Sequence, residues 1–268
     1  MNTPFFVGYL PFPKALKPFF QWAVPLLLLV GLATAYVFAV GTKEAGTGTW
    51  NAYDPVSLTG VVKAEPYPMI ITADRQNHPV LIVQLGKLDA AEILEPFDGK
   101  TVLIEGFMIE RGPWQMMEIE GPESVAEVPA LDLALPMDSA GMFVSLVGEI
   151  VDSKCMLGVM KPGAGKVHRD CAELCVLGGM PPMLLVKNDQ GEKAAYLLVD
   201  PDGNAVGRRL VPHIALPVAV EGIAFRMGDM TAIRVDPASV QELRGPAKLA
   251  FGESIGMAGT SSFCRIPS

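Results

Sequence analysis

Three of the four cysteines in this chain lie close together in one segment, and a histidine lies among them. The residues are Cys155, His168, Cys171 and Cys175. Thiolates and imidazoles bind zinc and softer metals such as copper, and thiols also form or exchange disulfides. The segment 152–182 is therefore where we expect the chemistry of this protein.

A short helix is expected to position most of these side chains. Residues 166–177 can form a helix, and Gly178 and Gly179 directly after them are a typical helix end. The histidine and the two later cysteines then stand at i, i+3 and i+7, on one face of the helix. Folding back the glycine-containing loop 158–163 would bring Cys155 onto the same face.

Three interpretations of these residues follow from the sequence. In an exported protein, disulfide formation is favoured, and Cys155 is a better partner for Cys171 or Cys175 than these two are for each other within a helix. The remaining cysteine could then pair with Cys264 or stay reduced. Thiol exchange is the second interpretation, because cations beside Cys171 would favour its thiolate.

A metal site is the third interpretation, with copper or zinc as the expected ion. Three thiolates and one imidazole would satisfy zinc tetrahedrally. Met180 and Met183 are secondary candidates, because thioethers suit copper, and Cys264 is another. A covalent c-type haem is not expected, because the chain lacks Cys-x2-Cys-His.

Two resemblances bear on this segment. Cys171 to Cys175 is similar to the Cys-x3-Cys core of the binuclear copper centre of respiratory oxidases, although Gly179 stands where that family has a histidine. The methionine position is also displaced, with Pro182 there and Met183 adjacent. Asp152-Ser153-Lys154-Cys155 followed by Cys171-Ala172-x-x-Cys175 resembles a motif of small uncharacterised bacterial exported OB-like domains. That resemblance covers about 143–236 and implies an extracytoplasmic location without an activity.

An uncharged segment near the N-terminus predicts a membrane anchor. The run 19–40 has 22 residues without a charge, and about 20 are needed to cross a bilayer as a helix. Lys14 and Lys17 precede it, so the N-terminus is expected in the cytoplasm and the rest of the chain outside. A cleaved signal peptide is the alternative, since Ala33-Thr34-Ala35 fits a cleavage site.

The charge of the chain narrows the classes of partner. The formal net charge is −8, and without the two lysines before the anchor it is about −10. Such an acidic body argues against nucleic acid as a partner. We expect instead the membrane and a membrane or periplasmic protein.

An internal repeat organises the rest of the chain. With a shift of 116 residues, positions 80–120 align without gaps on 196–236 and share eight identities in 41, including glycines and a proline. The strand that starts at Ser57 matches the one at Ser145 with a shift of only 88. The second copy therefore holds 28 extra residues, and the Cys/His segment lies among them.

Each copy is predicted to be a small barrel. Short apolar runs at about 57–63, 68–73, 79–85, 101–109 and 114–119 are separated by turn residues. A short helical stretch, 88–94, precedes the fourth run. Five strands with a helix between the third and the fourth resemble an OB-fold. The fold class is thus mainly β: a transmembrane helix, then two tandem OB-like barrels, the second with a helical Cys/His insertion.

These observations divide the chain as follows: 1–18 cytoplasmic leader, 19–40 transmembrane helix, 55–125 first barrel, 126–142 linker, 143–240 second barrel with the insertion 152–182, and 241–268 C-terminal tail. The predicted function is a bacterial inner-membrane accessory or docking protein of a redox or metal-handling assembly, with periplasmic domains. A metal-binding or thiol-redox protein is the alternative. The sequence has no convincing hydrolase motif or phosphate loop, and we do not expect an enzyme.

Overall fold

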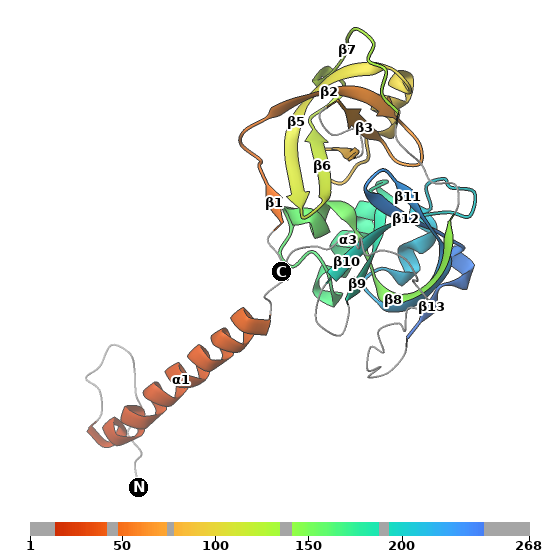
Figure 1. Ribbon diagram of the computed structural model, residues 1–268. Coiled ribbons are helices and arrows are strands. Elements are labelled where there is room, and N and C mark those ends of the chain that lie inside the picture. The colour runs from red at the N-terminus through yellow and green to blue at the C-terminus, as the bar shows by residue number, and fades with distance from the viewer. Residues whose placement is uncertain (1–13, 42–47, 74–77, 135–140, 188–192, 244–268) are drawn as a thin grey trace. The chain divides into compact units, whose positions relative to one another are not determined.

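A computed structural model describes residues 14–41, 48–73, 78–134, 141–187 and 193–243 of the chain (Figure 1). These residues belong to two compact units, one up to Lys43 and one from Glu44 onward. The first unit is the anchor helix, and the second contains both barrels. The leader and Cys264 lie outside the described residues.

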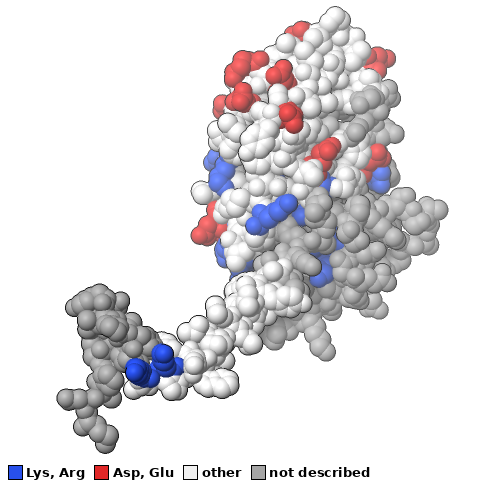
Figure 2. All heavy atoms as spheres, turned by 90° about the vertical axis from the view of Figure 1, so that its left-hand side faces the viewer, with Lys and Arg blue, Asp and Glu red and all other residues white. Residues whose placement is uncertain are grey.

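The anchor is one apolar helix, α1 (Lys17–Gly41), preceded by a short 3-10 turn, η1 (Lys14–Leu16). At about 1.5 Å per residue, 25 residues exceed the hydrocarbon core of a bilayer, roughly 30 Å. The only charges on it are the lysines at its start, and the rest of its visible surface is uncharged (Figure 2). The helix is therefore long and apolar enough to cross a membrane once, as the sequence predicts.

The first barrel contains the five predicted strands. Their bounds are β2 (Val56–Lys63), β3 (Met69–Thr72), β4 (Val80–Gln84), β5 (Thr101–Arg111) and β6 (Trp114–Ile119). Strand β2 pairs with β3 and β5, β3 pairs with β4, and β4 runs parallel to β6. Pairing of β5 with β6 closes the barrel. The predicted helix appears as α2 (Ala91–Leu94) and η2 (Glu95–Phe97), between the third and fourth strands.

The second barrel repeats this arrangement. Its strands are β8 (Met142–Asp152), β9 (Pro182–Lys187), β10 (Lys193–Val199), β11 (Pro217–Met227) and β12 (Met230–Val235), and η6 (Gly207–His213) takes the place of the helix. The register is repeated as well. Gly60 pairs with Val102, and Gly148 with Val218. The chain is thus mainly β with two closed five-stranded barrels in tandem, and the predicted fold class is confirmed.

Three short strands extend the edges of the barrels. They are β1 (Thr49–Trp50) and β7 (Val125–Glu127), both on β5, and β13 (Gln241–Glu242) on β11. The turns η3 (Pro122–Ser124) and η7 (Pro237–Ser239) precede β7 and β13. The repeat therefore continues past the fifth strand, and the start of the predicted linker pairs with β5.

The strand pairing locates the extra residues of the second copy. Val62 pairs with Ile70, and Ile150 pairs with Leu184. Ile150 lies 88 residues after Val62 in the chain, whereas Leu184 lies 114 residues after Ile70. The difference shows that 26 of the 28 extra residues lie between the first and second strands of the second barrel. They form the π-helical turn η4 (Cys155–Val159), the turn η5 (Lys166–His168) and helix α3 (Arg169–Leu177).

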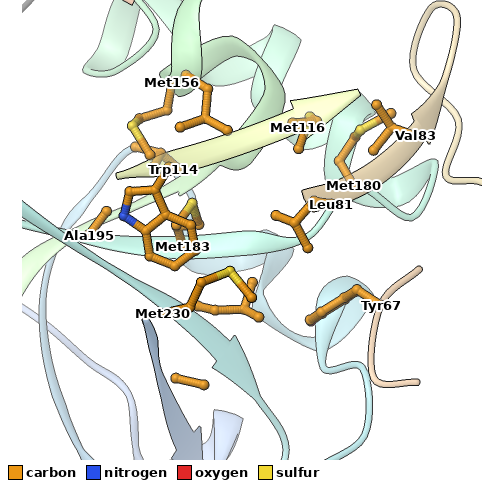
Figure 3. Close-up of a cluster of buried hydrophobic side chains, with 14 of the residues drawn as sticks. Tyr67, Leu81, Val83, Trp114, Met116, Met156, Met180, Met183, Ala195 and Met230 are labelled. Atoms are coloured by element: carbon orange, nitrogen blue, oxygen red, sulfur yellow. The ribbon is translucent and has the colours of Figure 1, made fainter. Parts of the chain in front are cut away.

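A third hydrophobic core joins the barrels, in addition to the interior of each. Strand β4 is apolar on both faces because each face contacts a different core. Val80 and Ile82 face the interior of the first barrel, whereas Leu81 and Val83 face the shared core. In β10, Leu197 and Val199 face the same shared core, together with Ala195, which Figure 3 labels. The barrels therefore pack against each other through equivalent faces.

Candidate functional site: a cysteine and histidine cluster beside the first barrel

The end of strand β8 fixes the first cysteine of the cluster. Asp152 is the last residue of β8 and is fully buried. Its Oδ1 accepts a hydrogen bond from the backbone N–H of Cys155 at 2.8 Å. The polypeptide turns into η4 at this point, so Cys155 is held directly beside the strand end.

The same carboxylate also orients the histidine. His168 ends η5 and precedes helix α3, and its Nε2 lies 3.0 Å from Asp152 Oδ2. Both side chains are buried. A carboxylate bonded to one ring nitrogen fixes the orientation of an imidazole and leaves the other nitrogen, here Nδ1, as the one that can bind a ligand.

The four sequence-predicted side chains come together in the structure. Ligand atoms of Cys155, His168 and Cys171 lie within 4.8 Å of one another, and so do those of Asp152, Cys155 and Cys175. The Sγ atoms of Cys155 and Cys171 are 4.0 Å apart, and the described cysteines form no disulfide with one another. Cys155 and Cys175 are buried and Cys171 is half-buried, so Cys171 is the most exposed of these three residues.

A lysine of the first barrel completes the cluster, and sequence reasoning did not find it. Lys87 Nζ donates hydrogen bonds to Cys171 Sγ at 2.8 Å and to Cys175 Sγ at 3.3 Å. It also donates to the carbonyl oxygen of Cys171 at 3.1 Å. Lys87 follows strand β4, 84 residues before Cys171. Only the packing of one barrel on the other brings the two together.

The loop that carries Lys87 is held against the insertion on both sides. Lys154 Nζ donates to the carbonyl oxygens of Gln84 at 2.9 Å and Gly86 at 2.8 Å, and forms a buried ion pair with Glu118. On the other side, the N–H of Asp89 donates to the carbonyl oxygen of Gly178 at 2.9 Å. A Cβ on Gly178 would lie 1.7 Å from the carbonyl oxygen of Lys87, so glycine is needed for this approach.

The pKa values of two of the thiols shift in opposite directions. The pKa of Cys175 is lowered to about 7, first because the thiol of Cys155 donates a hydrogen bond to it and also because of the Lys87 ammonium. The same hydrogen bond, together with burial, raises the pKa of Cys155. Burial acts to lower the pKa of Lys87, but its bonds to the sulfurs outweigh this and raise it. Cys175 is therefore more acidic than Cys155, and Lys87 stays charged.

The methionine candidates belong to the shared core. Met180 and Met183 are fully buried within the cluster of Figure 3, which also contains Trp114, Met116 and Met230. Cys155 and Cys175 belong to the same core, and Cys171 packs against it. Both methionines thus pack between the barrels.

No protein-family model, curated protein or solved structure matches the chain. The function is therefore argued from the geometry of its own residues.

Proposed function

We propose that the Cys/His cluster binds one soft or borderline transition-metal ion, copper(I) or zinc. The observation that carries this is the closeness of Cys155, His168 and Cys171, whose ligand atoms lie within 4.8 Å of one another. Ligands of a tetrahedral zinc or copper ion at ~2.0–2.3 Å from the metal lie slightly closer than this, so small side-chain rotations would complete the site. Cys175, which shares Cys155 as a neighbour, is the fourth donor.

The surroundings support a thiolate-rich metal site. The Asp152–His168 pair is the carboxylate–histidine arrangement that orients metal ligands. Three thiolates around a monovalent or divalent ion leave a net negative charge, and the Lys87 ammonium beside Cys171 and Cys175 offsets it. Cys171, half-buried, provides the entry point for the ion.

Metal titration of the full-length protein tests this proposal. The reduced protein in detergent is titrated with Zn²⁺, Cu⁺ or the spectroscopic probe Co²⁺ against a competing chelator. We expect one ion per chain, thiolate-to-Co²⁺ charge-transfer bands, and loss of both in Cys171→Ser. His213→Asn is the matched control, because this histidine pairs with Glu242 outside the cluster. A spectrum without thiolate bands, or one unchanged in Cys171→Ser, would overturn the proposal.

A reversible disulfide between Cys155 and Cys171 is the second candidate, favoured by their Sγ separation of 4.0 Å. Oxidation of the two thiols removes two protons and two electrons, which an exported protein passes to the thiol oxidants of its compartment. The disulfide and the metal exclude each other, because both use the same two sulfurs. Peptide mapping of unreduced protein distinguishes them: a linked Cys155–Cys171 peptide in metal-free protein supports this candidate, and its absence contradicts it.

We further propose a location in the bacterial inner membrane, with the N-terminus in the cytoplasm and both barrels in the periplasm. The lysines at the start of the anchor support this orientation, since positive charge is retained on the cytoplasmic side. Labelling of single cysteines with a membrane-impermeant reagent tests it. A cysteine introduced on the surface of a barrel should react in intact spheroplasts, and the cysteine introduced by Thr3→Cys should not. A mature N-terminus near Tyr36 would instead reveal cleavage.

In this setting the protein acts as an accessory or docking protein of a membrane redox or metal-handling assembly. The apolar anchor and the metal-binding cluster together support this role, because a tethered site can exchange an ion with a neighbouring membrane protein. Crosslinking in intact cells followed by purification tests the partner. Recovery of a metal-dependent or redox protein that is lost in the Cys171→Ser variant is expected, and recovery independent of the cluster would contradict the role.

A further inference from the structure

Lys87 directs its hydrogen bonds at two sulfurs rather than at a carboxylate. Its Nζ lies 2.8 Å from Cys171 Sγ and 3.3 Å from Cys175 Sγ. Among the ion pairs of the residues that the structure describes, none joins Lys87 to an acidic side chain. The amine nitrogen and the nearest sulfur are thus separated by little more than the space that one bridging atom would need.

We propose that in the metal-free protein Lys87 and Cys171 become joined by a covalent N–O–S bridge. The reaction consumes one dioxygen and releases one water. The ammonium carries three hydrogens and the thiolate none. Two of the three leave in the water, and one stays on the bridging nitrogen as N–H replaces NH3⁺. Sulfur and nitrogen each give up two electrons, and these four electrons reduce dioxygen to the water and to the bridging oxygen.

Cys171 rather than Cys175 is the expected partner for two reasons. Its sulfur is closer to Nζ, and its side chain is half-buried whereas Cys175 is buried. Oxidants reach exposed thiolates first. The lysine is also partly exposed.

The bridge would act as a redox switch. It would join the turn after β4 to helix α3 covalently, and so lock the first barrel onto the insertion. This consequence rests on the proposed metal site: the bridge uses a sulfur that the ion needs, so it would close the site under oxidising conditions. The bridge itself does not depend on a metal, because it is expected in the metal-free protein.

Mass spectrometry of the full-length protein tests the inference. The reduced, chelator-treated chain in detergent is exposed to air, and its intact mass is measured before and after addition of a thiol reductant. We expect a gain of one oxygen minus two hydrogens, reversed by the reductant, with a crosslinked peptide containing Lys87 and Cys171. A sulfenic acid would add a whole oxygen, and a disulfide would only remove two hydrogens.

Three variants make the result decisive. Cys175→Ser should keep the mass gain, whereas Cys171→Ser and Lys87→Arg should lose it. Lys87→Arg retains a cation beside the sulfurs, so its loss of the bridge separates covalent chemistry from thiolate stabilisation. An air-exposed wild-type protein that shows only the disulfide or sulfenic-acid mass would overturn the proposal, and so would a mass gain that persists in Lys87→Arg.

Discussion

At the scale of single residues, the buried ion pair between Lys154 and Glu118 links the cluster to the first barrel. Both side chains are almost fully buried, at 3% and 2% exposure, and Trp50 Nε1 also donates to Glu118 at 3.2 Å. Glu118→Gln removes the charge and leaves the Lys154 ammonium facing only neutral acceptors. We expect the free energy of unfolding, measured by urea denaturation, to fall by about 3–5 kcal/mol.

An exposed pair on the same barrel provides the control. Lys100 and Glu127 are 3.0 Å apart, with side chains about half exposed, so solvent screens their attraction. Glu127→Gln should change the free energy of unfolding by only ~0–1 kcal/mol. Equal losses in the two variants would mean that the Lys154–Glu118 pair does not hold the barrels together.

The hydrogen bond that Asp152 accepts from His168 gives a prediction for metal affinity. Asp152→Asn keeps the size of the side chain but offers the imidazole a weaker, uncharged partner. We expect metal affinity, measured by competition with a chelator, to weaken about 10–100-fold. Glu173→Gln is the matched variant, because it removes the Arg169–Glu173 pair on helix α3. Equal affinities in the wild type and Asp152→Asn would exclude an orienting role for the carboxylate.

At the scale of elements, substitutions at two glycines of the insertion distinguish the cost of backbone strain from the cost of a clash with the first barrel. Gly165 and Gly179 both have positive φ, at 83° and 97°. A Cβ on Gly165 meets nothing within 4 Å, whereas one on Gly179 would lie 1.6 Å from Asp89 Oδ2. Gly165→Ala should therefore cost about 1 kcal/mol from strain alone, and Gly179→Ala clearly more. Thermal denaturation measures both, and equal costs would show that α3 does not press on the Asp89 loop.

The sequence predicted the elements better than their assembly. Strand bounds, the helix over 166–177 and the repeat follow from local patterns, namely apolar runs, turn residues and helix-ending glycines. The shared core could not be predicted, because the apolar run of β4 fits any strand buried on both faces. Lys87 could not be found either. Its role depends on a contact with Cys171, which lies 84 residues later in the chain. The sequence around Lys87 resembles that of an ordinary exposed turn.

At the scale of the whole molecule, the two barrels form one compact unit rather than two independent domains. Residues from both line the methionine-rich core of Figure 3. Tyr67 of the first barrel also donates to the carbonyl oxygen of Leu198 at 2.8 Å and accepts from the N–H of Val206 at 3.2 Å. A single site built from both barrels is stable only if they stay together.

This arrangement predicts that the barrels unfold together. Ile82 lies in the interior of the first barrel, outside the shared core, and is 1% exposed. Ile82→Ala should lower the free energy of unfolding by about 2–5 kcal/mol through the cavity it leaves. Alkylation of Cys175, a buried residue of the insertion, reports on the other half of the molecule. If the barrels unfold as one, the urea midpoint for Cys175 alkylation shifts as far as the midpoint of the whole transition followed by circular dichroism. If the urea midpoint for Cys175 alkylation in Ile82→Ala stays at its wild-type value, the second barrel keeps its structure after the first has unfolded. Lys87 then cannot be an obligatory part of the site.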